Sequence, residues 1–368
     1  MAPYWISLIL AVGFMLAAQK PAKYEPNKDD AFFAGRDGRV YARWGVVCSA
    51  LVFIFLTGFR YGVGQDYFYT YVPYFERVCL GLGQQDMELG YYGLNLLVSC
   101  FTHDPFPVFL ICSLLFFSFT YAAIMRESSH PAFSVFLIFG MSYLFIYMNA
   151  MRQMVAVSIL LFSLRYIERR EPVKFIACVL VACLFHSSSL LFLIAYFFPR
   201  LKIGVLACSA AVLIFVALKA PIASLVNSVI AQTQYAGYIG SIFDTGETGN
   251  VIIAMNVVVL LFSAAIPKLT GKDYSNRYRL LLWCQLICTL VAILSGSIPL
   301  SQRIRWVFSL PSIILLPSAI DFIEDRRLKL IVQAVVVVLY VVYIAITIGM
   351  WNGNNVVPYQ SILTKGVL

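Results

Sequence analysis

About ten apolar runs dominate this 368-residue chain, and each is long enough to cross a membrane with tilt or a few flanking residues. Lipid offers the backbone no hydrogen-bond partners, so runs of this length cross it as helices. Two further apolar pieces differ: 91–102 is too short to cross easily, and 175–198 is interrupted by polar residues. The ten runs are 3–18, 44–59, 106–124, 132–149, 154–167, 203–219, 251–267, 279–296, 305–320 and 330–350.

Composition places the chain among integral membrane proteins. Hydrophobic residues make up 61% of it and charged residues 12%, whereas soluble domains carry about 45–50% and about 25%. The first run lacks a basic segment before it and a clear cleavage site after it, so we expect a retained helix. The expected fold is one polytopic, all-α membrane domain over residues 1–368, with about ten transmembrane helices plus short re-entrant or half-length helices.

The distribution of Lys and Arg predicts the orientation of the chain. With the N-terminus outside, six segments between the runs face the cytoplasm and hold 20 of the 27 Lys and Arg residues, a positive-inside pattern. This requires that 91–102 does not cross, and that 175–198 either returns to the cytoplasmic side or crosses twice as two short helices. Non-spanning backbone at this depth indicates a covered cavity. Both termini then lie outside, and the net charge of +9 reflects orientation and anionic lipid, not nucleic acid.

Four arginines remain at helix ends on the outer side: Arg60, Arg152, Arg303 and Arg305. An arginine this near to hydrocarbon costs on the order of 3 kcal/mol, so it usually faces a partner or a cavity. Three separate loops present these arginines on one membrane face, and the planar guanidinium fork suits phosphate oxygens. We therefore expect a pyrophosphate site. The alternative for each arginine alone is a side chain that snorkels to the interface.

The segment RYGVGQDYFYTYVPY at 60–74 joins an arginine and an aspartate to a run of tyrosines. A tyrosine offers a flat apolar face and one polar group, which suits the body of a sugar. An interfacial aromatic belt is the alternative. The outer-face loops are 60–90 and 220–250, and the second is either a lid over a cavity or a plain surface loop. The candidate sugar-binding residues are Tyr67, Tyr69, Tyr71, Tyr91 and Tyr92.

Three residues are candidates for activating a hydroxyl group: Asp66, Glu88 and His186. Each has a structural alternative: a salt bridge to Arg60 for Asp66, a helix N-terminus for Glu88, and a hydrogen-bonded packing role for His186. The sequence has no zinc-ligand spacing, phosphate-binding loop, nucleophile elbow or dinucleotide fingerprint. We expect no cofactor and no metal site; if a divalent cation did bridge a pyrophosphate, Asp66 would be its ligand.

Five segments resemble the EpsG family, which looks related to the Wzy-type polymerases of lipid-linked polysaccharide repeats. They occur in order along the chain and cover most of its length. The first and the third are the most specific, and the C-terminal third matches mainly in its arrangement. The segments are FRYGVGQDYFYTY at 59–71, MELGYYGLNLL at 87–97, MRQMVAVSILLFSLRYI at 151–167, LFHSSSLLFL at 184–193 and VPYQSI at 357–362.

The resemblance implies a GT-C-like polymerase in the cytoplasmic (inner) membrane of a bacterium. Such proteins are thought to transfer a growing glycan from undecaprenyl pyrophosphate to the non-reducing end of a fresh lipid-linked unit, at the outer face. The product is an exopolysaccharide or an O-antigen-type polymer. The implied substrate is an undecaprenyl-pyrophosphate-linked oligosaccharide, and a chain-length regulator and a flippase are candidate partners.

We hypothesise a metal-independent glycosyl transfer with the lipid pyrophosphate as leaving group. Arg152, Arg303 and Arg60 would hold the pyrophosphate, Gln153 and Arg305 would add substrate contacts, and the Asp66 carboxylate is the favoured base. The alternative functions are a glycan ligase, a glycan acyltransferase and, outside the enzymes, a lipid-linked sugar transporter. Ligation can use the same design of site, whereas a transporter should show internal repeats, which we do not find.

Overall fold

The computed structural model describes residues 1–20, 32–36, 38–84, 87–233, 236–239, 249–299 and 301–365. Helices account for 74% of the structure. The sheet within the described residues is one antiparallel pair of short strands, β1 (Phe32–Ala34) and β2 (Val40–Ala42). The expectation of an all-α membrane protein is confirmed.

Helices form where the sequence has its apolar runs, and they end where polar, Gly or Pro residues follow. Helices also occupy the two atypical pieces, 91–102 and 175–198. The elements on the ten runs are α1 (Ala2–Ala18), α2 (Arg43–Gly58), α5 (Phe106–Glu127), α6 (Pro131–Gly140), α7 (Tyr143–Asn149), α8 (Met151–Glu168), α10 (Val205–Ala217), α12 (Asn250–Leu269), α13 (Asn276–Leu294), α14 (Ser301–Ser309), α15 (Ser312–Ile320), α16 (Arg326–Ile344) and the π-helix η4 (Ala345–Met350). The others are the π-helix η1 (Tyr67–Tyr71), α3 (Val72–Cys79), α4 (Leu89–Ser99), α9 (Pro172–Cys183), the 3-10 helices η2 (Ser187–Arg200) and η3 (Ala236–Tyr238), and α11 (Lys219–Ile230).

Four of these helical stretches are long and apolar enough to cross a membrane: α5, α12, α13 and the joined α16 and η4. Three bent pairs raise the number to seven if each pair crosses once. The pair α6–α7 bends by 51°, α10–α11 by 76° and α14–α15 by 47°. Helices α1, α2 and α9 are apolar but shorter. The described residues thus indicate a multi-pass membrane protein, while the count of about ten crossings and the GT-C-like architecture stay predictions.

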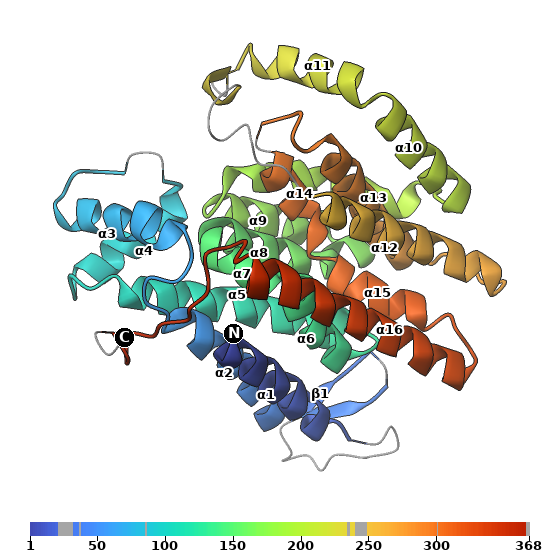
Figure 1. Cartoon of the computed structure of the whole chain (residues 1–368), viewed down its shortest axis with the longest axis horizontal. Coiled ribbons are helices and arrows are strands. Elements are labelled where there is room, and N and C mark those ends of the chain that lie inside the picture. The colour runs from blue at the N-terminus through green and yellow to red at the C-terminus, as the bar shows by residue number, and fades with distance from the viewer. Residues whose placement is uncertain are drawn as a thin grey trace.

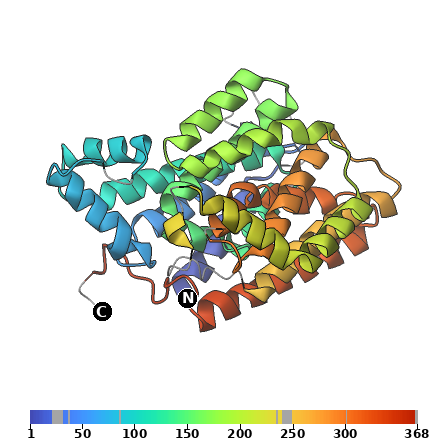
Figure 2. The same ribbon diagram turned by 90° about the horizontal axis from the view of Figure 1, so that it is seen from above.

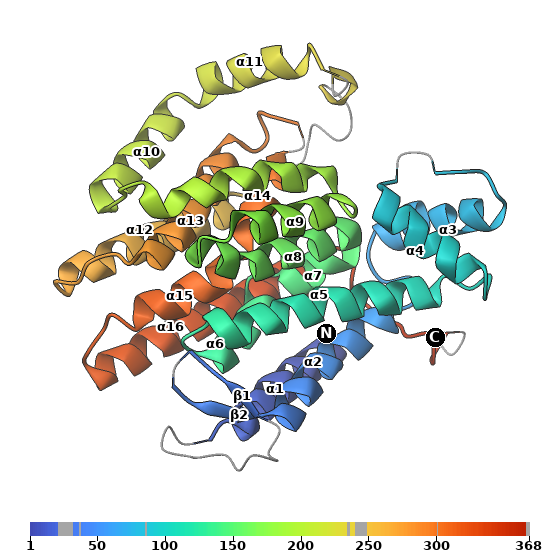
Figure 3. The ribbon, with the colours of Figure 1, turned by 180° about the vertical axis from the view of Figure 1, so that it is seen from behind.

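The helices form a bundle from which α3 and α4 project at one end (Figure 1). The same two helices stand apart from the bundle when it is seen from behind (Figure 3). Helices α10 and α11 form a bent arm that lies against α12 and α13 (Figure 2). The β1–β2 hairpin lies at the end of α1 and α2 that points away from α3 and α4 (Figure 1). The candidate site residues of segments 59–71 and 87–97 therefore lie at the end opposite the hairpin.

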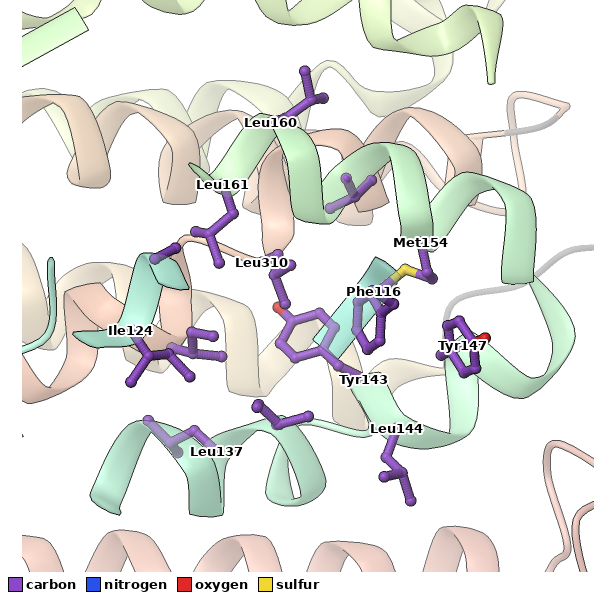
Figure 4. Close-up of a cluster of buried hydrophobic side chains, with 14 of the residues drawn as sticks. Phe116, Ile124, Leu137, Tyr143, Leu144, Tyr147, Met154, Leu160, Leu161 and Leu310 are labelled. Carbon is purple, nitrogen blue, oxygen red and sulfur yellow. The ribbon is translucent and has the colours of Figure 1, made fainter. Parts of the chain in front are cut away.

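Helix α8 is central to this packing. It contacts α5, α9, α14 and η2, and most of its side chains are buried. A helix that is apolar on every side suits such a position. Side chains of α5, α6, α7 and α8 gather beside Leu310 in one buried cluster (Figure 4). Because lipid is as apolar as these side chains, close packing and interhelical hydrogen bonds hold the helices together.

The last described residues return to the loop that follows α2. The backbone N–H of Tyr61 donates to the carbonyl of Gln360 (3.0 Å), and the N–H of Ile362 donates to the carbonyl of Phe59 (2.9 Å). Backbone pairing of this kind fixes the loop without depending on side-chain identity. Segments 59–71 and 357–362, which lie near opposite ends of the chain, therefore form one structural unit.

Candidate functional site

An ion pair between Arg152 and Glu88 is the centre of the candidate site. Arg152 lies in the first turn of α8, and Glu88 directly precedes α4. Arg152 Nη1 lies 2.6 Å from Glu88 Oε2, and the two side chains are 17% and 18% exposed. The guanidinium also lies over the rings of Tyr74 (5.4 Å) and Tyr91 (5.5 Å), whose faces attract a cation. The structure thus brings two predicted site residues into contact and holds Arg152 in a defined position.

Gly90 lets α4 approach the turn between α9 and η2. Its N–H donates to the carbonyl oxygen of Leu184 (2.8 Å), and a Cβ atom at Gly90 would lie only 2.7 Å from the Cβ atom of Leu184. On the same side, Glu88 Oε1 accepts from the backbone N–H of Ser187 (3.4 Å). Segments 87–97 and 184–193 therefore dock together, and this places the turn that contains His186 beside the ion pair.

His186 caps the N-terminus of η2 with its ring. Its Nδ1 atom accepts from the backbone N–H of Ser188 (3.3 Å) and lies 2.7 Å from the Ser188 hydroxyl. Burial, together with the positive charges of Arg303 and Arg152, lowers the pKa of His186 to about 3. The ring is therefore neutral at physiological pH. Since a backbone N–H can only donate, the proton of the neutral ring lies on Nε2, and His186 offers a ligand a donor rather than a base.

Gln153 joins three elements of the site. Its Nε2 atom donates to the backbone carbonyl of Arg303 (2.6 Å) and to the hydroxyl of Ser188 (3.3 Å), so α8, α14 and η2 meet at one amide. Gln153 is buried and Arg303 is exposed. We conclude that Gln153 positions Arg303, whose side chain is the accessible one of the two.

Asp66 lies between the glycine turn at 62–64 and η1. Burial raises the pKa of its carboxyl group, although the charges of Arg303, Arg60 and Arg152 act in the opposite direction. Among the ion pairs between described residues, none includes Asp66. The alternative of a salt bridge to Arg60 is therefore not seen. A carboxylate without an ion-pair partner, with a raised pKa and close to several arginines, is suited to accepting a proton.

Arg60 is not placed to bind a ligand. Its side chain is fully buried, Nη1 donates to the backbone carbonyls of Met148 and Val63, and the guanidinium lies 5.2 Å from the ring centre of Phe109. The loop after α2 packs against the end of α7, so buried carbonyls and rings take up this guanidinium. Its position does not support the prediction that Arg60 holds a pyrophosphate; the arginine instead fixes the loop that carries Asp66.

The candidate tyrosines fall into two groups by exposure. Tyr71 donates to the carbonyl of Asn149 (2.5 Å) and accepts from the backbone N–H of Met151 (2.6 Å). Its hydroxyl therefore pairs a backbone N–H at the start of α8 that has no partner within the helix. Such a tyrosine supports the site without facing a ligand. The buried group is Tyr67, Tyr71 and Tyr91, and the accessible group is Tyr69, which is 84% exposed, and the partly exposed Tyr92.

A cavity of about 580 Å³ lies beside α14. It extends along the break between α6 and α7, along α12 and along the C-terminal part of α16. Arg305 is the cation in its wall; the side chain is 8% exposed, and its Nε atom has no hydrogen-bond partner among the described contacts. The rest of the wall is rich in aromatic rings and amides: Tyr143, Asn256, Gln285, Gln302, Trp306, Tyr340, Tyr343, Trp351 and Asn354.

Arg303 and Arg305 lie on different sides of α14. Successive residues of an α-helix are about 100° apart, so two side chains separated by two positions leave the helix in nearly opposite directions. Arg303 acts electrostatically on Asp66 and His186, whereas Arg305 lines the cavity. The predicted arginine cluster is therefore divided into two groups by one short helix.

Two cavity residues that the sequence analysis overlooked are Asn256 and Gln285. Gln285 Nε2 donates to Oδ1 of Asn256 (3.1 Å), which joins α13 to α12 at the cavity wall. Both residues interrupt long apolar runs, and polar side chains at such positions usually face a partner or a cavity. That signal could have identified this wall of the cavity in advance.

Parts of the predicted loops lie outside the described residues. These parts are residues 85 and 86 of the loop at 60–90, and residues 234, 235 and 240–248 of the segment at 220–250. The described part of the second segment contains most of α11 and the short helix η3, so its function as a lid stays a prediction. Across the described ranges, no group of three or more His, Cys, Asp or Glu residues is placed to hold a metal ion.

Comparison with known proteins identifies the family. No curated protein and no solved structure matches the chain significantly. The model of the EpsG family matches residues 43–361, a range that holds the Arg152 site, the cavity and the C-terminal segment paired with the loop after α2. A match over this much of the sequence establishes membership, and the chain belongs to the EpsG family.

Proposed function

We propose that this chain is a membrane glycosyltransferase that polymerises undecaprenyl-pyrophosphate-linked repeat units into an exopolysaccharide or O-antigen-type polymer. Membership of the EpsG family points to an exopolysaccharide-related polymerase. The observation that carries the more specific proposal is the convergence of Arg152, Arg303, His186 and Asp66 at one end of the bundle. Cations, a neutral donor and a carboxylate together match the needs of a reaction that expels a pyrophosphate.

The transfer forms one carbon–oxygen bond and breaks another. A hydroxyl of the acceptor repeat attacks the anomeric carbon of the donor glycan, and the bond from that carbon to the pyrophosphate oxygen breaks. The Asp66 carboxylate accepts the hydroxyl proton, and the lipid pyrophosphate departs with the bonding electrons. A raised pKa makes Asp66 a stronger base than an exposed aspartate while leaving it ionised above that pKa.

The arginines stabilise the charge that grows on the leaving group. Arg152 and Arg303 come from different helices, α8 and α14, and can approach a pyrophosphate from two sides. Charge stabilisation by groups already in position is usually the largest catalytic contribution. The Nε2–H of His186 adds a neutral donor to the same oxygens or to a sugar hydroxyl. Glu88, bound to Arg152 at 2.6 Å, orients that arginine rather than acting as the base.

The cavity beside α14 serves the lipid-linked substrate. Its aromatic wall suits sugar faces, and Arg305 supplies one cation in an otherwise neutral lining. Outside the cavity, Tyr69 and Tyr92 are the accessible candidate tyrosines, and they belong to the segments that carry Asp66 and Glu88. In this proposal the chain has the GT-C-like arrangement of about ten crossings, lies in the cytoplasmic membrane of a bacterium with both termini outside, and works from the outer face.

A strain that lacks this chain tests the proposal. It would be complemented with the native sequence, with Arg152→Ala, or with Arg77→Ala as a control arginine of α3 outside the site. We expect single lipid-linked repeats to accumulate without the chain, and the native and Arg77→Ala forms, but not Arg152→Ala at equal membrane levels, to restore polymer. Accumulation of long lipid-linked polymer would indicate a ligase, and an unchanged glycan pool would overturn the proposal.

A chelator separates the metal-independent reaction from its alternative. If the arginines alone neutralise the pyrophosphate, polymer formation by membranes persists in excess EDTA. Loss of activity in EDTA, with recovery on adding Mg²⁺, would instead make Asp66 a metal ligand.

A further inference from the structure

A second, smaller cavity of about 150 Å³ lies where the C-terminal ends of α8 and η2 meet the start of α13. These are the segments that the charge bias assigns to the cytoplasm, at the opposite end of α8 from Arg152. The cavity lining is strongly basic. Four arginines and a single carboxylate belong to it: Arg170, Arg200, Arg277, Arg279 and Glu168.

Ion pairs within this end of the bundle leave the cavity with excess positive charge. Glu168 pairs with Arg36 (3.2 Å), and Arg277 pairs with Glu127 (3.0 Å). Within the described residues, Arg170 and Arg200 take part in no ion pair, and both are exposed. Two guanidinium groups are therefore available to an anion at the mouth of the cavity.

Arg279 shapes the cavity by joining two of its walls. Its Nε and Nη2 atoms donate to the carbonyl of Tyr274 (3.2 and 3.1 Å), and Nη1 donates to the carbonyl of Pro199 (3.3 Å). These bonds connect α13 to the end of η2. Its charge remains uncompensated by a carboxylate in the described structure and adds to the field inside the cavity.

Arg170 has a backbone conformation that is uncommon for a residue other than glycine. Arg170 follows the C-terminus of α8 with a φ of +58°, a conformation that favours glycine at this position of a helix end. An arginine in the left-handed region carries a steric cost that a glycine would avoid.

The mouth of the cavity borders exposed apolar side chains. Phe197, next to the lining residue Tyr196, is 58% exposed, and Leu201, which follows Arg200, is 44% exposed. Apolar side chains beside a basic cavity at the end of membrane helices can contact the acyl chains of a lipid whose head group enters the cavity. The cavity is large enough for a phosphate group and part of the lipid head group attached to it, and it is too small for an oligosaccharide repeat.

We propose that this cavity binds the phosphate group of an anionic phospholipid in the cytoplasmic leaflet. Basic pockets between helices on this side of a membrane are known to bind such head groups, and arginine forms paired hydrogen bonds to phosphate oxygens. The bound lipid joins the ends of α8, η2 and α13. Since it binds only the folded protein, it stabilises the bundle.

Native mass spectrometry of the full chain, released from vesicles of phosphatidylcholine and phosphatidylglycerol in a 3:1 ratio, tests this site. The test variant is Arg170→Gly with Arg200→Gln, and the control is Arg169→Gln with Arg327→Gln. The control removes two exposed arginines from the same end of the bundle, outside the cavity. We expect the native and control proteins to retain phosphatidylglycerol, and we expect the test variant to retain at least tenfold less of it than the native protein. Equal retention by all three proteins would overturn the proposal.

Thermal unfolding of the purified chain in neutral detergent distinguishes the source of the phosphate. Added phosphatidylglycerol should raise the melting temperature of the native and control proteins but not of the test variant. An equal rise with inorganic phosphate, lost in the test variant, would support the cavity and assign its ligand to solution. Because Arg170→Gly relieves a left-handed residue, we expect the test variant without lipid to melt no lower than the control. A rise with phosphatidylglycerol that is as large in the test variant as in the control would contradict the site.

Discussion

The contact at Gly90 predicts opposite outcomes for two glycine substitutions in one helix. Gly90 and Gly93 both lie in α4. A Cβ atom at Gly90 would lie 2.7 Å from Leu184 Cβ and 2.8 Å from Leu184 O, whereas a Cβ atom at Gly93 would meet nothing within 4 Å. The substitutions Gly90→Ala and Gly93→Ala therefore add the same methyl group to a closed and to an open environment.

The expected size of each effect follows from these distances. Ordinary contacts between carbon atoms are about 3.5–4.0 Å, so α4 must move about 1 Å away from Leu184 in Gly90→Ala. That shift stretches the 2.8 Å hydrogen bond from Gly90 N to Leu184 O to about 3.8 Å. The lost hydrogen bond lowers the free energy of unfolding by about 0.5–1.5 kcal/mol, and this is part of a total overpacking cost of about 1–3 kcal/mol. Gly93→Ala should instead stabilise the helix by about 0.5–1 kcal/mol.

Activity should separate the two variants more than stability does. Glu88 lies two residues before Gly90, so the same shift displaces the carboxylate that holds Arg152, and a displacement of about 1 Å in a site can cost about 100-fold in rate. Purified proteins would be compared by thermal unfolding, and polymer yield would be measured in the complemented strain. Equal melting temperatures and equal polymer yields for the two variants would refute the close docking of α4 on the turn at His186.

Three further predictions concern protonation and the cavity. If Asp66 is the base, Asp66→Asn abolishes transfer, and the native rate is full above the raised pKa of Asp66 and is lost as pH falls through it; a pH–rate profile without an acid limb would contradict this assignment. The pKa of His186 is about 3 in the folded chain against a usual 6.5. Its contribution to stability is therefore full above about pH 6.5 and declines as the pH falls below that value, because between the two pKa values only the unfolded chain binds the proton. His186→Gln should flatten this decline in thermal unfolding at pH 4.5–7, and an unchanged slope would count against the buried neutral ring. Arg305→Gln should raise the donor concentration needed for half-maximal rate by about 10–100-fold, as expected for one lost charge-assisted hydrogen bond, while an exposed arginine substitution, Arg327→Gln, leaves it unchanged; equal values for both would remove the cavity from substrate binding.

The helices could be predicted from the sequence because each apolar run must pair its own backbone N–H and C=O groups in lipid. The bends were harder to predict. Helix α6 ends at Gly140, a residue that often ends helices, but the left-handed residue of the break between α6 and α7 is Ser142, with a φ of +68°. A left-handed serine is set by the packing around it, so tertiary structure rather than local sequence decides where this run bends.

Only part of the candidate site was predictable from the sequence: Glu88 contacts Arg152, whereas Arg60 is buried and Arg305 lines a separate cavity. Helical periodicity alone separates Arg303 from Arg305, and attention to the 100° step would have placed them on different faces. Arg60 differs, because a sequence cannot distinguish an arginine that meets a ligand from one whose guanidinium is taken up by Met148 and Phe109. The pairing of Glu88 with Arg152 depends on how α4 docks against the turn at Leu184, and no local pattern encodes that docking.

Polymerisation by the purified, reconstituted chain is the direct test of the proposed glycosyl transfer. The purified native chain in vesicles would receive a lipid-linked repeat unit on undecaprenyl pyrophosphate, with Arg152→Ala and Arg77→Ala chains run in parallel. We expect the native and Arg77→Ala proteins, but not Arg152→Ala, to form a ladder of lipid-linked glycans and to release one undecaprenyl pyrophosphate for each bond formed. A native protein that releases no carrier and forms nothing longer than the single repeat would contradict the proposed transfer.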